Sequence, residues 1–85
     1  MTQLINIGFG NLVNSDKIVA IISAESAPAK RQIAYSKERH QFIDGTQGRK
    51  TKSLIYTTDE YIITSSLQTD TLLNRFYCSD KNDKN

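Results

Sequence analysis

The 85-residue chain has few of the residues that form disulfides, bind structural metals or take part in catalysis in many small proteins. It contains one cysteine (Cys78), one histidine (His40), one proline and no tryptophan. One cysteine cannot form an internal disulfide, and a single His with a single Cys does not supply a structural zinc site. We therefore expect no metal and no cofactor. The lone cysteine also indicates a reducing compartment, so the predicted location is the cytoplasm.

Long apolar runs are absent as well. No segment approaches the roughly 20 apolar residues of a membrane-spanning helix, and no charged region followed by an apolar one resembles a signal peptide. We expect a soluble protein without a membrane partner.

A catalytic constellation is also missing from the sequence. His40 stands alone beside Arg39, the neighbouring acids Asp59 and Glu60 fall in a predicted loop, and Cys78 has only Arg75 as a nearby cation. The prediction is that the protein is not an enzyme.

The elements that are present predict a small α+β domain of about five short, mostly antiparallel strands and two helices. The strand candidates are 4–7, 12–13, the nearly continuous apolar run 17–22, a central hairpin over 42–57, and 61–66. A tight turn over 8–11 follows the first strand, and the run 17–22 is expected to be buried on both faces.

The helices have clear start signals. Ser26 can cap a helix running from Ala27 to about His40, with Pro28 in its first turn. A second helix is predicted from Thr69 or Asp70 to Phe76–Tyr77. We assign residues 1–78 to one domain and 79–85 to a disordered charged tail.

Positive charge is concentrated in the middle of the chain. Residues 30–52 hold seven cations against two acids, a net +5, whereas the rest holds four cations against seven acids, a net −3. The centre of this region is 43–56, in which Gly45 and Gly48 are predicted to form the hairpin turn and Asp44 to accept a hydrogen bond within it. Such a distribution favours an anionic partner.

Three ungapped motifs resemble the RemA-like regulators of bacterial extracellular matrix genes. They are Asn-Ile-Gly-Phe-Gly-Asn at 6–11, Glu-Ser-Ala-Pro-x-Lys-Arg at 25–31, and Ile-Asp-Gly-Thr-Gln-Gly-Arg-Lys-Thr at 43–51. The resemblance covers roughly residues 2–77. It implies a transcriptional regulator that binds duplex DNA as a closed ring of identical subunits, with a fold similar to LytTR-type DNA-binding domains.

The family's DNA contacts match Lys17, Arg49 and Lys50. The family usually has arginine where this chain has Lys17 and Lys50, and often an aromatic residue where it has Gln47. Lysine keeps the charge but lacks the planar fork that grips a phosphate or a guanine edge, so phosphate contacts are favoured over sequence reading. The other predicted DNA-binding residues, from the basic region itself, are Lys52, Lys30 and Arg31.

A short chain has a thin core, which favours self-association. A ring also repeats a weak basic patch and raises its avidity. The candidate ring interface pairs the apolar surface of Leu72, Leu73 and Phe76 with the small-residue face from Ala24 to Ala29. Two alternatives remain: a scaffolding oligomer whose basic turn pairs with acids of a neighbouring subunit, and an RNA-binding protein.

Overall fold

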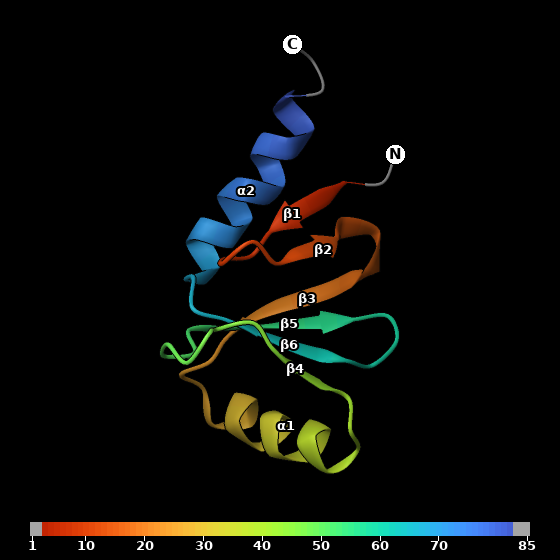
Figure 1. The fold of residues 1–85 in the computed structure, drawn as a ribbon, viewed down its shortest axis with the longest axis vertical. Coiled ribbons are helices and arrows are strands. Elements are labelled where there is room, and N and C mark those ends of the chain that lie inside the picture. Colours follow the sequence, from red (N-terminus) through yellow and green to blue (C-terminus); the bar gives the residue numbers. More distant parts are fainter. Residues whose placement is uncertain (1–2, 83–85) are drawn as a thin grey trace.

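A four-stranded sheet lies between one helix on one side and a two-stranded hairpin with a second helix on the other (Figure 1). The computed structural model describes the backbone of residues 3–82. The small α+β domain has six strands and two helices in the order β1 (Leu4–Asn6), β2 (Leu12–Asn14), β3 (Ile18–Ser23), α1 (Ala27–Glu38), β4 (Phe42–Asp44), β5 (Ser53–Thr57), β6 (Ile62–Ser65) and α2 (Thr69–Asn82). A short 3-10 turn, Ser15–Lys17, connects β2 to β3.

The strand order of the larger sheet is β3-β5-β6-β4. β5 pairs antiparallel with β3 and β6, whereas β4 pairs parallel with β6, in the register Ile43 opposite Ile63. The predicted hairpin over 42–57 is therefore wrong, because β6 lies between β4 and β5. The segment from Gly45 to Lys52 is a loop that crosses the end of β6 to join two strands that are not neighbours.

β1 and β2 form the smaller sheet, with Ile5 opposite Val13. The predicted turn between them is confirmed: the amide of Ile7 donates to the carbonyl of Asn11 at 2.9 Å, and Gly8, Phe9 and Gly10 all have positive φ. Glycine adopts this conformation at little cost, but a bulky side chain such as Phe9 rarely does.

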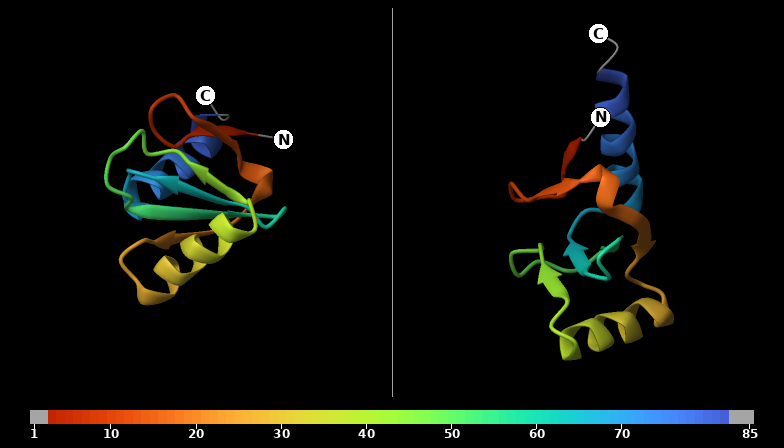
Figure 2. Two further views of the ribbon diagram at one scale, coloured as in Figure 1. Left: turned by 60° about the horizontal axis from the view of Figure 1, so that its bottom comes forward. Right: turned by 90° about the vertical axis from the view of Figure 1, so that its right-hand side faces the viewer.

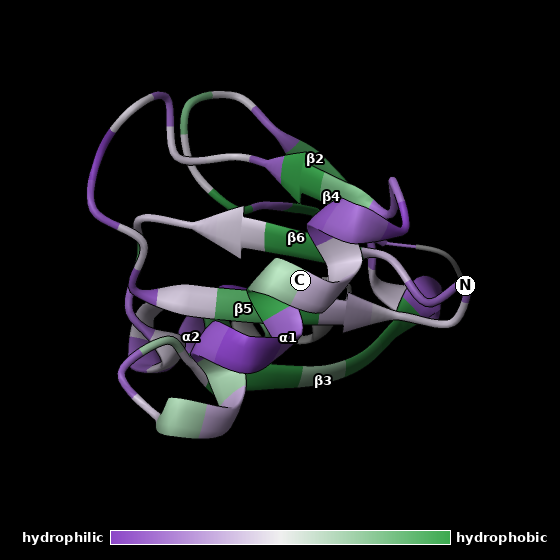
Figure 3. Cartoon of the chain, turned by 90° about the horizontal axis from the view of Figure 1, so that it is seen from below, coloured by the Kyte–Doolittle hydropathy of each residue, from purple (hydrophilic) through white to green (hydrophobic). Residues whose placement is uncertain are grey.

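The core has two parts, one on each face of the four-stranded sheet. Leu54 packs toward Ala29 and Ile62 beneath α1, and Ile55, the next residue of β5, packs toward Ile7 and Leu72 beneath the hairpin and α2. This alternation is the pattern of a central strand. Figure 3 shows the hydrophobic segments along β3 and β5, and hydrophilic colour over much of the loop between β4 and β5.

β3 is an edge strand, so the prediction that it is buried on both faces is wrong. Its Val19 side chain is 65% exposed, and none of its residues is fully buried. β-Branched sequence alone does not distinguish a central strand from an edge strand that another surface covers.

The helix starts follow the sequence signals. The Ser26 hydroxyl accepts a hydrogen bond from the amide of Ala29 at 3.2 Å, which caps α1. α1 ends at Glu38, two residues before the predicted end at His40. His40 itself has a positive φ, which is not helical. α2 continues to Asn82, through four of the residues assigned to a disordered tail; residues 83–85 lie outside the described part of the chain.

The two helices occupy opposite ends of the molecule (Figure 2). In residues 3–82, neither helix combines the length and the apolar character needed to cross a bilayer. Of the residues predicted to form a ring interface, Leu72, Ala24 and Ala29 are buried in the core of the chain. Leu73, Ala27 and Pro28 are exposed.

Candidate nucleic-acid interface

The basic loop 46–52 is fixed at its first residues by the carboxylate of Asp44. One oxygen of Asp44, Oδ1, accepts hydrogen bonds from the Thr46 amide at 2.9 Å, the Thr46 hydroxyl at 2.6 Å and the Thr64 hydroxyl at 3.0 Å. The hydrogen bonds from Thr46 contribute most to holding the pKa of Asp44 below its ordinary value of 3.8, because they favour the charged form. The predicted role of Asp44 in the turn is confirmed.

Gly45 is required by close approach. A Cβ at this position would lie 2.6 Å from the backbone oxygen of Thr64, to which the Gly45 amide donates at 3.0 Å. The carbonyl of Gly45 accepts from the Asn11 side chain at 3.3 Å, which ties the loop to the β1–β2 turn.

The other end of the loop is fixed between two strands. The Lys52 amide donates to the Ser65 carbonyl at 2.9 Å, and the Lys52 carbonyl accepts from the Ala24 amide at 3.0 Å. Between these anchors, the Arg49 amide donates to the Thr46 carbonyl at 3.0 Å, closing a turn in which Gln47 and Gly48 have positive φ. The loop has defined geometry although it contains no strand or helix.

Three predicted site residues meet in this loop. Arg49, Lys50 and Lys52 are exposed and line one hollow together with Phe9 and Ser66. The Arg49 guanidinium carbon lies 5.9 Å from the centre of the Phe9 ring, within the range of a cation–π contact. We define Arg49, Lys50 and Lys52 as the basic loop cluster.

Two acids lie near this cluster. Lys50 and Lys52 also line a second hollow with Glu25 and Asp70. Within the described residues, no ion pair joins either lysine to these carboxylates. The lysine charges therefore remain accessible to an external anion, although the acids weaken the local field.

Lys30 ends the first turn of α1, Arg31 follows it at the start of the second turn, and both are exposed. The N-terminal end of α1 lies on the same side of the molecule as the β4–β5 loop (Figure 1). Lys30 and Arg31 line neither of the two hollows described for the basic loop cluster, so they extend the positive surface outside those two hollows.

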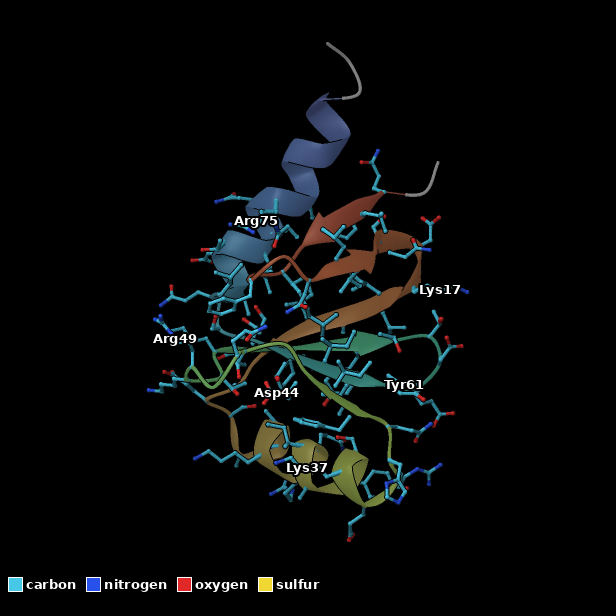
Figure 4. The ribbon with its side chains drawn as sticks, in the orientation of Figure 1. Lys17, Lys37, Asp44, Arg49, Tyr61 and Arg75 are labelled. Carbon is cyan, nitrogen blue, oxygen red and sulfur yellow. The ribbon has the colours of Figure 1, made fainter. Side chains whose placement is uncertain are left out.

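Lys17 is separated from the other predicted residues. Figure 4 places Lys17 and Arg49 on opposite sides of the molecule. The Lys17 carbonyl accepts from the Thr58 amide at 2.8 Å, and the residue lines a shallow groove with Leu12, Ile43 and Tyr61. Within this chain, Lys17 and the basic loop cluster do not form a single patch.

Sequence reasoning did not place Phe9 or Asn11 in the site. Both belong to the motif 6–11, but their partners Arg49 and Gly45 are distant in sequence, and the contacts depend on the packing of the hairpin over the sheet. In the described residues, no group of three or more His, Cys, Asp and Glu side chains is placed to hold a metal ion.

The fold and this site define a small α+β protein that presents a rigid, solvent-exposed basic loop at one end of its sheet. The chain matches the RemA-like family, described as "Extracellular matrix regulatory protein A-like", over residues 4–76. The chain belongs to this family.

Cyanobacterial relatives extend over nearly the same length. A protein of Nostoc punctiforme named "Putative regulatory protein Npun_R3866" is 51% identical over 77 residues, which cover 91% of this chain and 88% of the relative. A Synechococcus protein named "Putative regulatory protein" is 52% identical over 75 residues, covering 88% of this chain and 84% of the relative.

Proposed function

We propose that this chain is a non-enzymatic transcriptional regulator that binds duplex DNA as a ring of identical subunits. Its fold would be of the LytTR type, its place of action the cytoplasm, and its targets genes of the extracellular matrix or biofilm. The family match and the names of the relatives support the regulatory role. The exposed cations of the basic loop cluster support duplex DNA, a polyanion, as the ligand.

The observation that carries the proposal is the anchored basic loop cluster. Arg49, Lys50 and Lys52 project from a loop whose two ends are held by hydrogen bonds to β6 and to the residue after β3. Because the loop backbone is already ordered, docking of a phosphate backbone costs no further ordering of the loop, and only the cationic side chains lose rotamer freedom. Two of the three are lysines, which bind phosphate as point charges, so the contacts are with the DNA backbone more than with base edges.

A ring is proposed because one subunit offers few cations. Repetition of the cluster converts later contacts into intramolecular ones and raises avidity by ~10²–10⁴. It also repeats Lys17, which lies far from Arg49 in its own subunit and lines the same groove as Leu12, Ile43 and Tyr61, so a neighbouring subunit that covers this groove brings its own residues beside Lys17.

The apolar surfaces left outside the core suggest how subunits would meet. Val19 and Tyr35 are exposed on one side, where β3 and α1 line a groove, and Leu12, Ile43 and Tyr61 are exposed on the other, beside β4. We define these as the β3 surface and the β4 surface. β3 and β4 are the two opposite edges of the sheet. A closed ring needs two different surfaces that meet head to tail, and these two satisfy that requirement.

The deciding experiment measures DNA affinity and mass on the same sample. Fluorescence anisotropy with a random duplex of about 30 base pairs, repeated across a salt series, should give log K falling linearly with log salt, at a slope near −0.9 for each phosphate neutralised. Light scattering should report one species of several subunits. A multimer that does not bind duplex DNA at low salt would favour the scaffolding alternative. A preference for structured RNA over the duplex would favour the RNA-binding alternative.

A further inference from the structure

Phe9 has a conformation and a location that the core does not explain. Its φ is +56°, in the left-handed region that bulky residues rarely occupy, and its side chain is 49% exposed. The ring belongs to neither of the two buried clusters. A strained, exposed aromatic residue that serves no core is a reason to look for a functional contact.

The contact is with Arg49. The guanidinium carbon lies 5.9 Å from the ring centre, and the two residues line one hollow with Lys50, Lys52 and Ser66. The Arg49 side chain makes no hydrogen bond or ion pair with any other described residue. The Phe9 ring is thus the contact that the described residues offer this guanidinium.

A second arginine of the chain, Arg39, also lies over an aromatic ring, and its hydrogen bonds differ from those of Arg49. Arg39 lies 5.3 Å from the ring of Tyr35, but it also donates to the Tyr35 hydroxyl at 3.0 Å and to the Gln41 side chain at 3.0 Å. Its donors are partly occupied within the protein. Phenylalanine has no hydroxyl, so contact with Phe9 leaves every side-chain donor of Arg49 available to an external anion.

We propose that Phe9 is a positioning residue for the DNA site: its ring holds the Arg49 guanidinium toward the hollow shared with Lys50 and Lys52. Only the effect on DNA binding rests on the proposed function; the contact between Phe9 and Arg49 does not. An exposed arginine side chain that has no partner in the protein loses rotamer freedom when it binds a phosphate. A contact with Phe9 before binding reduces that loss. Cation–π attraction at exposed sites corresponds to about a two- to fivefold effect on an equilibrium.

The experiment uses Phe9→Leu, which keeps an apolar side chain at the same strained φ, and Phe9→Tyr, which keeps the ring. Affinity for the duplex should fall at least twofold in Phe9→Leu and by less than that in Phe9→Tyr. In the Arg49→Ala background, Phe9→Leu should cause no further loss, because the ring acts through the guanidinium. Arg39→Ala is the matched control and should leave DNA affinity unchanged in samples whose mass by light scattering matches that of the wild type.

A measurement without DNA keeps this proposal separate from the proposed function. The Arg49 Nε–Hε resonance should be shifted by the ring current in wild type and in Phe9→Tyr, and move toward the free-arginine position in Phe9→Leu. An unshifted Arg49 resonance in wild type would overturn the positioning role whether or not DNA binds. A Phe9→Leu loss that persists in full without Arg49 would overturn it as well, since the ring would then contact DNA directly.

Phe9→Gly provides an independent check against a purely structural role. Glycine relieves the positive φ, so the melting temperature should not fall even though the ring is removed. DNA affinity should still decrease at least twofold. A decrease in melting temperature with unchanged affinity would assign Phe9 to folding instead.

Discussion

The hydroxyl of Thr64 donates a 3.0 Å hydrogen bond to Asp44, a residue 20 positions earlier in the neighbouring parallel strand. The same carboxylate oxygen accepts two hydrogen bonds from Thr46 at the start of the basic loop. One oxygen thus joins the end of β4, the loop and the buried side chain of β6. These hydrogen bonds favour the charged form of the carboxylate, so they connect the loop to the ionisation of Asp44.

Asp44 should make stability depend on pH in acid. Its folded pKa lies below the ordinary 3.8, so its stabilisation is fully present above about pH 3.8 and is lost as the pH falls through the lower folded value. Asp44→Asn should lower the free energy of unfolding by about 1 kcal/mol or less at pH 7, because the site is exposed. Urea melts of both proteins from pH 7 to pH 2.5 should show this difference shrinking below pH 3.8. A difference that stays constant to pH 2.5 contradicts the assignment.

Gly45→Ala should be more damaging than Gly48→Ala. A Cβ at Gly45 meets the Thr64 backbone oxygen at 2.6 Å, so β4 must move away from β6. Overpacking of this kind costs about 1–3 kcal/mol, and the Gly45–Thr64 hydrogen bond is weakened as well. Gly48 has open space around it, so alanine there adds only the cost of positive φ, about 1 kcal/mol. Thermal melts should rank wild type, Gly48→Ala and Gly45→Ala in decreasing stability; equal melting temperatures for the two variants would refute the close-approach argument.

The local elements could be predicted from sequence because their signals are local. The Ser26 cap, the Gly8–Gly10 turn and the acceptor role of Asp44 each depend on groups within a few residues. The two interior strands and both helices also followed from apolar pattern and capping.

Strand pairing could not be predicted in the same way. Two β-prone segments separated by two glycines fit a hairpin locally, yet Ile43 pairs with Ile63 and β6 lies between them. That choice is made by packing between distant residues, which no local pattern contains. The same strand order separates Lys17 from Arg49, and the packing of the β1–β2 hairpin over the sheet brings Phe9 to Arg49. The composition of the site therefore depends on contacts between distant segments as well.

The proposed ring predicts an unusual mixing result. Val19→Glu places a charge on the β3 surface, and Ile43→Glu places one on the β4 surface; both side chains are exposed in the subunit, so each variant should fold with little change in melting temperature. Each alone should be monomeric by light scattering. A mixture should form dimers, because each dimer can use the intact β4 surface of Val19→Glu against the intact β3 surface of Ile43→Glu. Multimers in either single variant would rule out that surface as the interface.

The basic loop cluster should govern DNA affinity without governing assembly. In each engaged subunit, Arg49→Ala or Lys50→Ala leaves one phosphate without its cation, so affinity should fall for every duplex sequence tested. The slope of log K against log salt should flatten by about 0.9 for each phosphate that is no longer neutralised. The residues are exposed, so the free energy of unfolding should change by no more than about 0.5 kcal/mol.

Arg39→Ala is the control for this measurement. It removes an exposed arginine that is also stacked on an aromatic ring, but at the far end of α1 from the loop. Arg39 lines the groove of the β3 surface, so the comparison uses samples whose mass by light scattering matches that of the wild type. In those samples affinity and slope should be unchanged, because general loss of positive charge acts weakly beyond a Debye length of about 8 Å at physiological salt. Equal losses in Arg39→Ala and Arg49→Ala would indicate nonspecific attraction to the whole subunit. Disassembly of the multimer in Arg49→Ala, with DNA binding abolished only as a consequence, would instead place the arginine at an interface between subunits.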